Sequence, residues 1–339
     1  MTFFLYFYRR IHDATEQMKK TLLILFLLAS VAALAQERNP LSVKVYPQAS
    51  LSSNVGQRQF SGLTYLGQNL YAAVDDKLPG GGIVYLQINL DDYGRVRMGI
   101  PEATAQSAIS GRDNEGIAFV PGTQRLWVSS EADQCIREYG LDGLETGRSL
   151  RVPAEFGVGR ITPNMGFEAL TFNAATGRFW TTTEGPLQGE NTQRLLAFTA
   201  DGEVAGTWLY QMEAPQKSAA STSAYVFGIP ALAAMDDGRV LVLEREVYVP
   251  NGGILEKAFR SFTRMQLFVV DPAAAAPGGL LAKESVASWT SSALNLANFE
   301  GMCLGPELSD GSRALLLIAD SQGGSGGLTS EYIKLIAIQ

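Results

Sequence analysis

Short apolar runs of strand length alternate with turns rich in Gly, Asp, Asn and Pro along most of the chain. In NEGIAFVPGTQRLWVSSE, at 114–131, two such runs flank the turn PGTQ. This pattern is typical of a β-hairpin, because successive side chains of a strand point to opposite faces. After residue 35 we find no stretch of helical length with the period of an amphipathic helix. We therefore expect an all-β protein.

The hairpin pattern occurs five times in the sequence. Each copy has an apolar run, a turn, a second apolar run and then an acidic residue. The copies begin at Phe60, Asn114, Phe167, Gly228 and Asn298. Repetition of one supersecondary unit at this spacing indicates a repeat architecture, in which each unit packs only against its neighbours.

Further strand-like segments follow each hairpin. We expect the pairs 83–90 with 95–100, 135–141 with 149–153, 194–199 with 204–210, and 265–272 with 284–290. The fifth hairpin is followed only by 332–338, and the segment 41–47 can supply its missing strand. This arrangement describes a β-propeller of five four-stranded blades, closed by the N-terminal strand so that no long sheet edge is left exposed. A six-blade propeller and a β-sandwich are the alternatives.

The apolar segment 21–35 differs from the hairpins. It follows Met18-Lys19-Lys20 and ends in Ala33-Leu34-Ala35. A positive start, an apolar stretch and a small-residue end are typical of a secretory signal peptide, and the stretch is short for a membrane span of about 20 residues. We expect a signal peptide at 1–35, with Met18 favoured as the true start, and a single propeller domain at 36–339. The protein should then be secreted or periplasmic, without a stable membrane span.

Composition excludes several kinds of chemistry. The single histidine, His12, lies in the expected signal peptide, so the mature chain would lack a Ser-His-Asp triad or a His-ligated zinc site. A net charge of −7 without any basic run disfavours a nucleic-acid partner. Cys135 and Cys303 have no metal-type spacing, and we expect two buried free thiols. A monomer that acts on a small molecule fits these features.

Carboxylates occupy matching positions in the hairpins. The first strand of a propeller blade lies nearest the axis and runs antiparallel to the second, so its start and the end of the second strand lie on one face. Side chains at these positions should meet at one mouth of the central channel. The carboxylates concerned are Glu115, Glu131, Glu168, Glu184, Glu300 and Asp320. Two hairpins depart from the pattern at the start, with Ser61 and Pro230.

So many carboxylates cannot all ionise at close range unless positive charge lies among them. Ca²⁺ suits the site, because it takes about six to eight oxygen ligands in flexible geometry. We predict metal ligands at Glu115, Glu168, Glu300 and Asp320. In the alternative, each carboxylate accepts backbone N–H groups or pairs with an arginine of the adjacent blade, and the ring holds the blades together.

Several of these phrases resemble the phytase-like propeller family, described as having "esterase-like activity of phytase". The resemblance runs through most of residues 60–339. It rests on Glu115-Gly116, Glu300-Gly301, Phe167–Leu170, Thr183–Leu187, Leu243-Glu244-Arg245 and Asp320. It implies a secreted or periplasmic propeller that hydrolyses phosphate esters, with calcium supplying the positive charge at the site.

The resemblance and the shared face of these side chains lead to a hypothesis for the reaction. Ca²⁺ binds the phosphoryl oxygens and lowers the pKa of a water, while Glu131 or Glu184 acts as the general base and Arg245 orients the anion. The candidate substrate contacts are Arg112, Asn114 and Glu244. The segment SAASTSAY, 218–225, is interpreted as a loop near the mouth. The alternatives are a metal-dependent sugar-lactone hydrolase and a non-catalytic secreted binding or scaffold propeller.

Overall fold

The computed structural model describes residues 40–51, 58–75, 82–91, 96–99, 113–220, 222–292, 295–321 and 331–339. The expected signal peptide at 1–35 and the candidate substrate contact Arg112 lie outside the described residues. Residues Ser42–Gln339 form one compact unit. In the part of the chain that the structure describes, no helix has the length and apolar character needed to cross a membrane.

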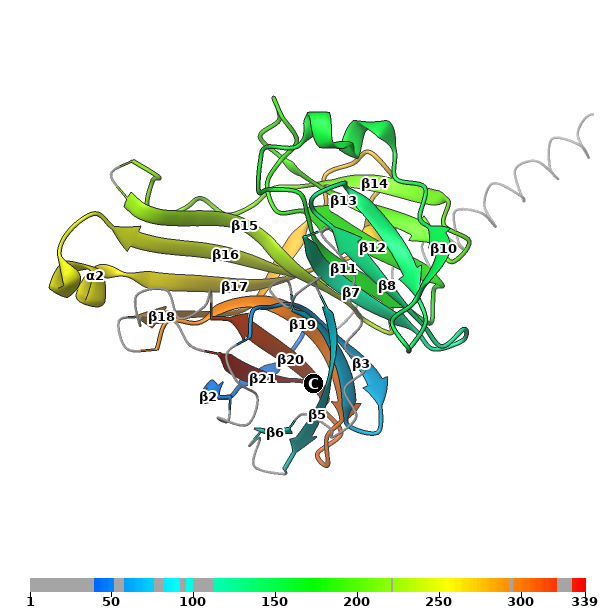
Figure 1. Cartoon of the computed structure of the whole chain (residues 1–339), viewed down its shortest axis with the longest axis horizontal. Helices are drawn as coiled ribbons and strands as arrows, with labels where there is room; N and C mark the ends of the chain where they lie inside the picture. The colour runs from blue at the N-terminus through cyan, green and yellow to red at the C-terminus, as the bar shows by residue number, and fades with distance from the viewer. Residues whose placement is uncertain are drawn as a thin grey trace, which may run out of the picture. The chain divides into compact units, whose positions relative to one another are not determined.

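The strands pair into consecutive hairpin sheets (Figure 1). The first blade holds β3 (Phe60–Gly67), β4 (Leu70–Asp75), β5 (Gly82–Leu90) and β6 (Val96–Gly99). The second holds β7 (Asn114–Val120), β8 (Arg125–Ser130), β9 (Cys135–Tyr139) and β10 (Glu145–Ser149). The third holds β11 (Phe167–Asn173), β12 (Arg178–Thr183), β13 (Gln193–Thr199) and β14 (Val204–Tyr210). The fourth holds β15 (Thr222–Ala234), β16 (Val240–Pro250), β17 (Phe262–Val270) and β18 (Lys283–Ser292).

The fifth sheet joins the two ends of the described chain. It contains β19 (Asn298–Glu307), β20 (Arg313–Asp320) and β21 (Tyr332–Ile338), with β1 (Val43–Val45) as the outer strand. β1 lies antiparallel to β21, and the short β2 (Ala49–Ser50) also pairs with β21. The innermost strands β3, β7, β11, β15 and β19 contact one another in ring order. The five-blade propeller closed by the N-terminal strand is therefore confirmed.

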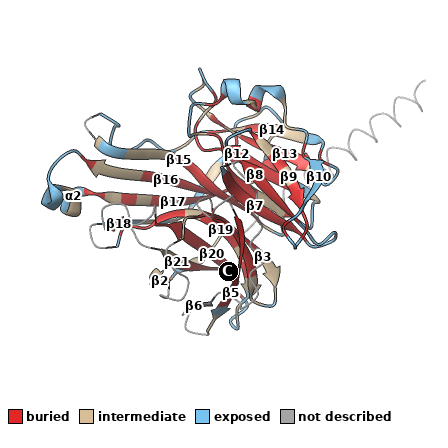
Figure 2. Cartoon of the chain, in the orientation of Figure 1, coloured by how far each residue is buried: buried red, intermediate tan, exposed pale blue. Residues whose placement is uncertain are grey.

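Apolar side chains fill the space between neighbouring blades, and Figure 2 shows burial along the inner and middle strands. Between the first and second blades, Val74 and Ile83 pack in one cluster with Ile117 and Leu126. Between the second and third, Trp127 packs with Phe179 at a ring-centroid distance of 5.1 Å. Each blade thus buries its alternating apolar face against the next blade, as the period-two pattern requires.

A β-bulge interrupts every innermost strand at the same place. The ladder between the first and second strands of each blade shifts register there. The shifts fall at Ser61, Glu115–Gly116, Glu168, Ile229–Pro230 and Glu300. A bulge leaves one residue unpaired and re-aims its side chain. Three of the five blades place a glutamate at this re-aimed position.

Small residues lie within or directly after the bulge in all five blades. They are Gly62, Gly116, Ala169, Ala231 and Gly301. A Cβ atom on Gly62 would lie 2.4 Å from the carbonyl oxygen of Glu115, and one on Gly116 would lie 2.5 Å from the backbone nitrogen of Leu170. The inner strands of adjacent blades therefore approach too closely at these points for a side chain.

Two expectations from the sequence need correction. The outer strand of the second blade is β10, Glu145–Ser149, and not 149–153. All five residues of β10 are exposed, so this strand has no apolar alternation by which it could be recognised. Cys303 is buried as expected, but Cys135 is only half-buried.

The fourth blade is longer than its repeat pattern predicts. β15 and β16 stay paired from Gly228 opposite Arg245 out to Thr222 opposite Pro250. Helix α2 (Ile254–Arg260) then connects β16 to β17. The segment 218–225, interpreted as a loop, is therefore strand from Thr222 onward. We call the extension, residues 222–228 and 245–264, the arm; it projects from the fourth blade in Figure 1.

Candidate functional site

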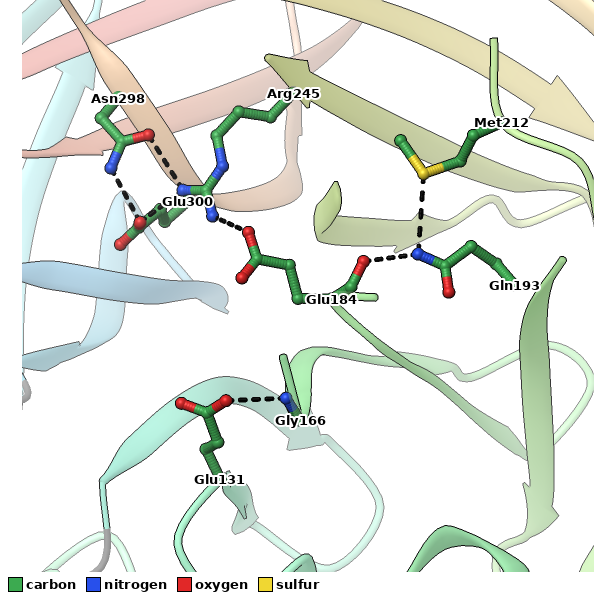
Figure 3. A network of polar contacts seen from close by, with 8 residues as sticks. All are labelled: Glu131, Gly166, Glu184, Gln193, Met212, Arg245, Asn298 and Glu300. Carbon is green, nitrogen blue, oxygen red and sulfur yellow. Dashed lines mark hydrogen bonds and ion pairs between the residues drawn. The ribbon is translucent and has the colours of Figure 1, made fainter. Parts of the chain in front are cut away.

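A buried arginine links three blades at the mouth end of the axis (Figure 3). Arg245, on β16, donates from Nη2 to Glu184 and from Nη1 to Glu300. The same Nη1 donates to Asn298 Oδ1 at 2.9 Å, and Asn298 Nδ2 donates to Glu300 at 2.8 Å. These side chains come from the third, fourth and fifth blades. The network therefore matches the alternative in which an arginine ties adjacent blades together.

Arg245 occupies the place where other blades carry a carboxylate. It faces Gly228 across the ladder, as Glu184 faces Gly166 and Asp320 faces Asn298. Burial alone would lower the pKa of Arg245, but the carboxylates of Glu184, Glu300 and Glu168 raise it overall. The guanidinium is only 3% exposed and stays charged because these carboxylates surround it.

Glu168 lies at the bulge of β11 and lines a small axial cavity of ≈ 10 Å³ together with Glu300. Glu168 is buried, with only 8% of its surface exposed. None of the described residues makes a hydrogen bond or ion pair with its side chain. Burial raises the pKa of Glu168 well above its ordinary value, and the charges of Glu115, Glu184 and Glu300 raise it further. Glu168 therefore holds a proton more readily than an ordinary glutamate. If it ionises, its negative charge lies among other carboxylates and would be stabilised by a bound cation.

A second carboxylate group lies at the start of the second blade. Oxygens of Asp113, Glu115 and Glu131 all lie within 4.8 Å of one another. Glu131 accepts a hydrogen bond from the backbone N–H of Gly166 at 2.7 Å. Burial raises the pKa of Glu131, the Gly166 bond lowers it in part, and the charges of Asp113, Glu184 and Glu300 raise it. We call Asp113, Glu115 and Glu131 the carboxylate trio.

The carboxylate trio fits a hard divalent cation. Its donors are all oxygens, which are the ligands that Ca²⁺ prefers. Asn114 lies between two members in sequence and is 2% exposed, and its amide nitrogen has no acceptor among the described residues. A buried donor without a partner is costly, so this amide is suited to an oxygen atom of a ligand.

Comparison with known proteins identifies the family of this chain. The family model described as "Phytase-like: Esterase-like activity of phytase" matches residues 56–322. The chain belongs to this family. A search of curated proteins found no match.

Solved structures similar to this phytase-like chain share little sequence with it. An endo-arabinase from Bacteroides thetaiotaomicron has 11% identity and a TM-score of 0.48, with 86% of this chain and 98% of that one covered. A luciferin-regenerating enzyme has 11% identity and a TM-score of 0.42, with coverage of 86% and 95%. A member of the duf4221 family from Bacteroides vulgatus has 8% identity and a TM-score of 0.42, with coverage of 89% and 99%. These similarities are too low to carry an argument about function.

The structure of the phytase-like domain brings most of the predicted site residues into one electrostatic cluster. Its members are Glu115, Glu131, Glu168, Glu184, Arg245 and Glu300. Asp320 ends β20 opposite Asn298 at the same end of the ladder and is 7% exposed. Its role as a metal ligand stays a prediction.

Glu244 lies apart from this cluster. Its Oε1 accepts hydrogen bonds from the Tyr210 hydroxyl at 2.6 Å and from Lys283 Nζ at 2.7 Å. Its Oε2 accepts one from the backbone N–H of Glu213 at 2.9 Å. Successive residues of a strand point to opposite faces, so Glu244 points away from the side to which Arg245 points. The structure gives Glu244 a role in holding the connector after β14.

Sequence reasoning missed Asp113. The residue precedes Asn114 and faces Glu131, whose backbone N–H donates to the Asp113 carbonyl at 2.8 Å. Its position in the sequence could have indicated it, because the residue that directly precedes an inner strand lies at the same mouth of the channel as the start of that strand. Sequence reasoning also gave no sign of the bulge, since register shifts depend on pairing rather than on residue pattern.

Proposed function

We propose that this phytase-like protein hydrolyses phosphate esters at the propeller mouth, with Ca²⁺ bound by the carboxylate trio. The observation that carries this proposal is the closeness of the three carboxylates, within 4.8 Å of one another, beside the unpartnered amide of Asn114. The family's esterase-like description supports the reaction class. Secretion through the segment 1–35 belongs to the same proposal.

In this proposal Glu131 is a metal ligand and Glu184 is the general base. Arg245 acts as a positioning residue, because its bond to Glu184 orients that carboxylate. Glu184 accepts a proton from the attacking water, and Glu168, with its raised pKa, donates a proton to the departing alcohol oxygen. Asn114 donates to an anionic oxygen of the ester. Calcium, when bound, would add positive charge beside the carboxylate trio, in addition to that of Arg245.

The test compares Glu115→Gln with Glu284→Gln, which changes an exposed carboxylate on β18. Calorimetric titration with Ca²⁺ and release of phosphate from a panel of phosphomonoesters are measured for both variants and for the unchanged protein. We expect Glu115→Gln to weaken calcium binding and to slow phosphate release, each at least about tenfold. Glu284→Gln should change neither. Phosphate release that is unaffected by chelator would contradict the proposal.

The Arg245 network supports a second candidate function, that of a binding or scaffold propeller. Both terminal nitrogens of Arg245 are already bonded to Asn298, Glu184 or Glu300, so these carboxylates serve the architecture of the ring. Calcium binding without turnover of phosphate esters would favour this function. Turnover of neutral lactones instead would favour a lactone hydrolase.

A further inference from the structure

The most exposed large apolar side chains in the described chain lie together on one helix. Ile254 is 86% exposed, Leu255 is 74% exposed and Phe259 is 78% exposed, and all three belong to α2. Figure 2 shows α2 at the tip of the arm, away from the buried strands. Exposed apolar residues scattered singly are normal on a protein surface, whereas a concentrated group marks an interaction site.

The arm carries this helix beyond the mouth face of the propeller. The paired strands extend from Gly228 opposite Arg245 to Thr222 opposite Pro250, which is six residue-to-residue steps along β15. At the usual rise of a strand this is about 20 Å. Residues 222–228 precede the bulge of β15, and the part of an inner strand that precedes the bulge leads out of the mouth where the bulge carboxylates lie. The apolar tip and the candidate site therefore face the same way.

The arm is a built structure rather than a loose loop. Glu246, on β16, is only 1% exposed. It accepts hydrogen bonds from the backbone N–H groups of Gln216 and Lys217 at 2.9 Å and 2.8 Å, and it pairs with Arg264 at 2.8 Å. The connector after β14 is thereby fixed to the arm. The strands that carry α2 are therefore supported near their base.

The chemistry around the tip combines basic and aromatic groups. α2 carries Glu256 in its first turn and Lys257 and Arg260 in its last turn, and Arg260 pairs with Glu256 at 2.9 Å, so the helix has a net charge of +1. Lys217 Nζ lies 5.8 Å from the ring centroid of Tyr248, which stacks on Phe262 at 5.5 Å. Apolar side chains flanked by basic and aromatic ones are typical of segments that lie in a membrane interface. The net charge of the whole chain is −7, whereas α2 at the tip of the arm carries more basic than acidic side chains, a charge that complements an anionic surface.

We propose that the arm docks onto an anionic lipid surface. Ile254, Leu255 and Phe259 enter the boundary between headgroups and acyl chains. Lys217, Lys257 and Arg260 lie at the level of the lipid phosphates. Docking in this way would turn the propeller mouth toward the membrane. The proposal does not depend on the reaction proposed for the mouth, because binding is measured without any turnover.

Flotation with vesicles tests the proposal. Phosphatidylglycerol–phosphatidylcholine vesicles are compared with pure phosphatidylcholine vesicles, using the full chain. The triple variant Ile254→Ser, Leu255→Ser, Phe259→Ser is matched by a control triple elsewhere on the surface. The control substitutions are Leu144→Ser, Val158→Ser and Leu280→Ser, at residues 69%, 58% and 58% exposed. We expect binding to the anionic vesicles, a loss of at least about tenfold in the α2 triple and no loss in the control.

A second variant keeps the test independent of changes in folding. Phe259→Trp should show a blue-shifted emission on addition of anionic vesicles, and high salt should weaken the binding. Flotation that is absent, or equal in both triples, overturns the proposal. So does a dimer of the unchanged chain that the α2 triple abolishes, because a second copy would then cover the helix. Retention of α2-dependent binding to a protein partner, without vesicle binding, overturns it as well.

Discussion

Arg245 illustrates how one residue changes the role of a repeated position. Its counterparts in the third and fifth blades are carboxylates, and its own blade has Pro230 where three other blades have the bulge glutamate. The fourth blade thus contributes a positive charge and no competing negative one. Without this guanidinium, Glu184 and Glu300 would be left close together and without their shared partner. The residue therefore contributes to stability whether or not it contacts a substrate.

We expect Arg245→Met to lower the free energy of unfolding by about 3–5 kcal/mol, because removing one partner of a buried ion pair leaves the others unpaired. Urea denaturation in chelator measures the change. Arg151→Met is the control, since Arg151 is 74% exposed in its pair with Glu203. Loss of such an exposed pair should cost at most about 1 kcal/mol. Equal losses in the two variants would contradict a structural role for the Arg245 network.

Glu168 gives a prediction about pH. Its pKa is raised in the folded state, so the folded protein binds a proton that the unfolded chain releases. Stability is then fully present below the ordinary glutamate pKa of about 4.3 and falls as pH rises through the raised value. Glu168→Gln removes this loss. We expect the variant to melt at a higher temperature than the unchanged protein near pH 8 and at a similar temperature near pH 4.

Thermal melting from pH 4 to pH 8 in chelator checks this expectation. Chelator is needed because a bound cation would stabilise the ionised carboxylates and mask the effect. Parallel melting curves for Glu168→Gln and the unchanged protein, offset equally at every pH, would show that Glu168 does not hold the proton.

At the scale of the element, the inner strand combines a bulge with a small residue. The bulge aims a side chain at the axis, and the following Gly or Ala lets the next blade come close. Gly116 is the clearest case, since a Cβ there would lie 2.5 Å from Leu170 N and 2.7 Å from Glu168 O. Backbone atoms cannot rotate away as the end of a side chain can. The close approach is therefore a requirement of the ring.

We expect Gly116→Ala to destabilise the fold by about 1–3 kcal/mol through overpacking. Gly122→Ala is the matched control in the same blade, because a Cβ on Gly122 would meet no atom within 4 Å. Urea denaturation of both variants checks the difference. If both variants unfold at the same urea concentration, the inner strands can move apart without cost.

Apolar runs made the inner hairpins predictable, and their absence hid other elements. β7 and β8 are buried along nearly all their length, so their apolar runs stood out in the sequence. β10 is exposed throughout, and the arm mixes polar and apolar residues, so neither showed a core-facing pattern. The register shifts left no mark on composition, because a bulge is a property of two paired strands.

The sequence allowed prediction of those site residues whose position follows from the direction of the inner strand. Glu115, Glu168 and Glu300 were placed on one mouth by the start of the first strand, and the structure brings their charges together. Glu244 was expected among them, yet it lies beside Arg245 in sequence and so points to the opposite face of β16. The sequence did not show which of the two neighbours faces the axis, since both are polar.

At the scale of the whole molecule, closure depends on a short strand. β1 has only three residues, yet it pairs with β21 and completes the fifth sheet. This pairing was predictable from the number of strands. The fifth blade lacked a fourth strand in the sequence after its hairpin, and the N-terminal segment contained one strand that no other blade needed. Joining the two ends of the described chain in one blade also covers the edge of β21, which would otherwise be free to pair with another molecule.

Lys44→Pro tests how far closure determines stability. Proline removes a backbone N–H and is poorly tolerated within a paired strand, whereas Lys44→Ala keeps the N–H and changes an exposed side chain. We expect Lys44→Pro to lower the melting temperature by several degrees, consistent with a loss of about 1–3 kcal/mol. The released edge of β21 should also cause concentration-dependent association in size-exclusion chromatography with light scattering. Lys44→Ala should stay monodisperse and melt like the unchanged protein. If Lys44→Pro behaves like Lys44→Ala, contacts between the inner strands are sufficient to keep the propeller closed, and pairing of β1 with β21 adds no stability.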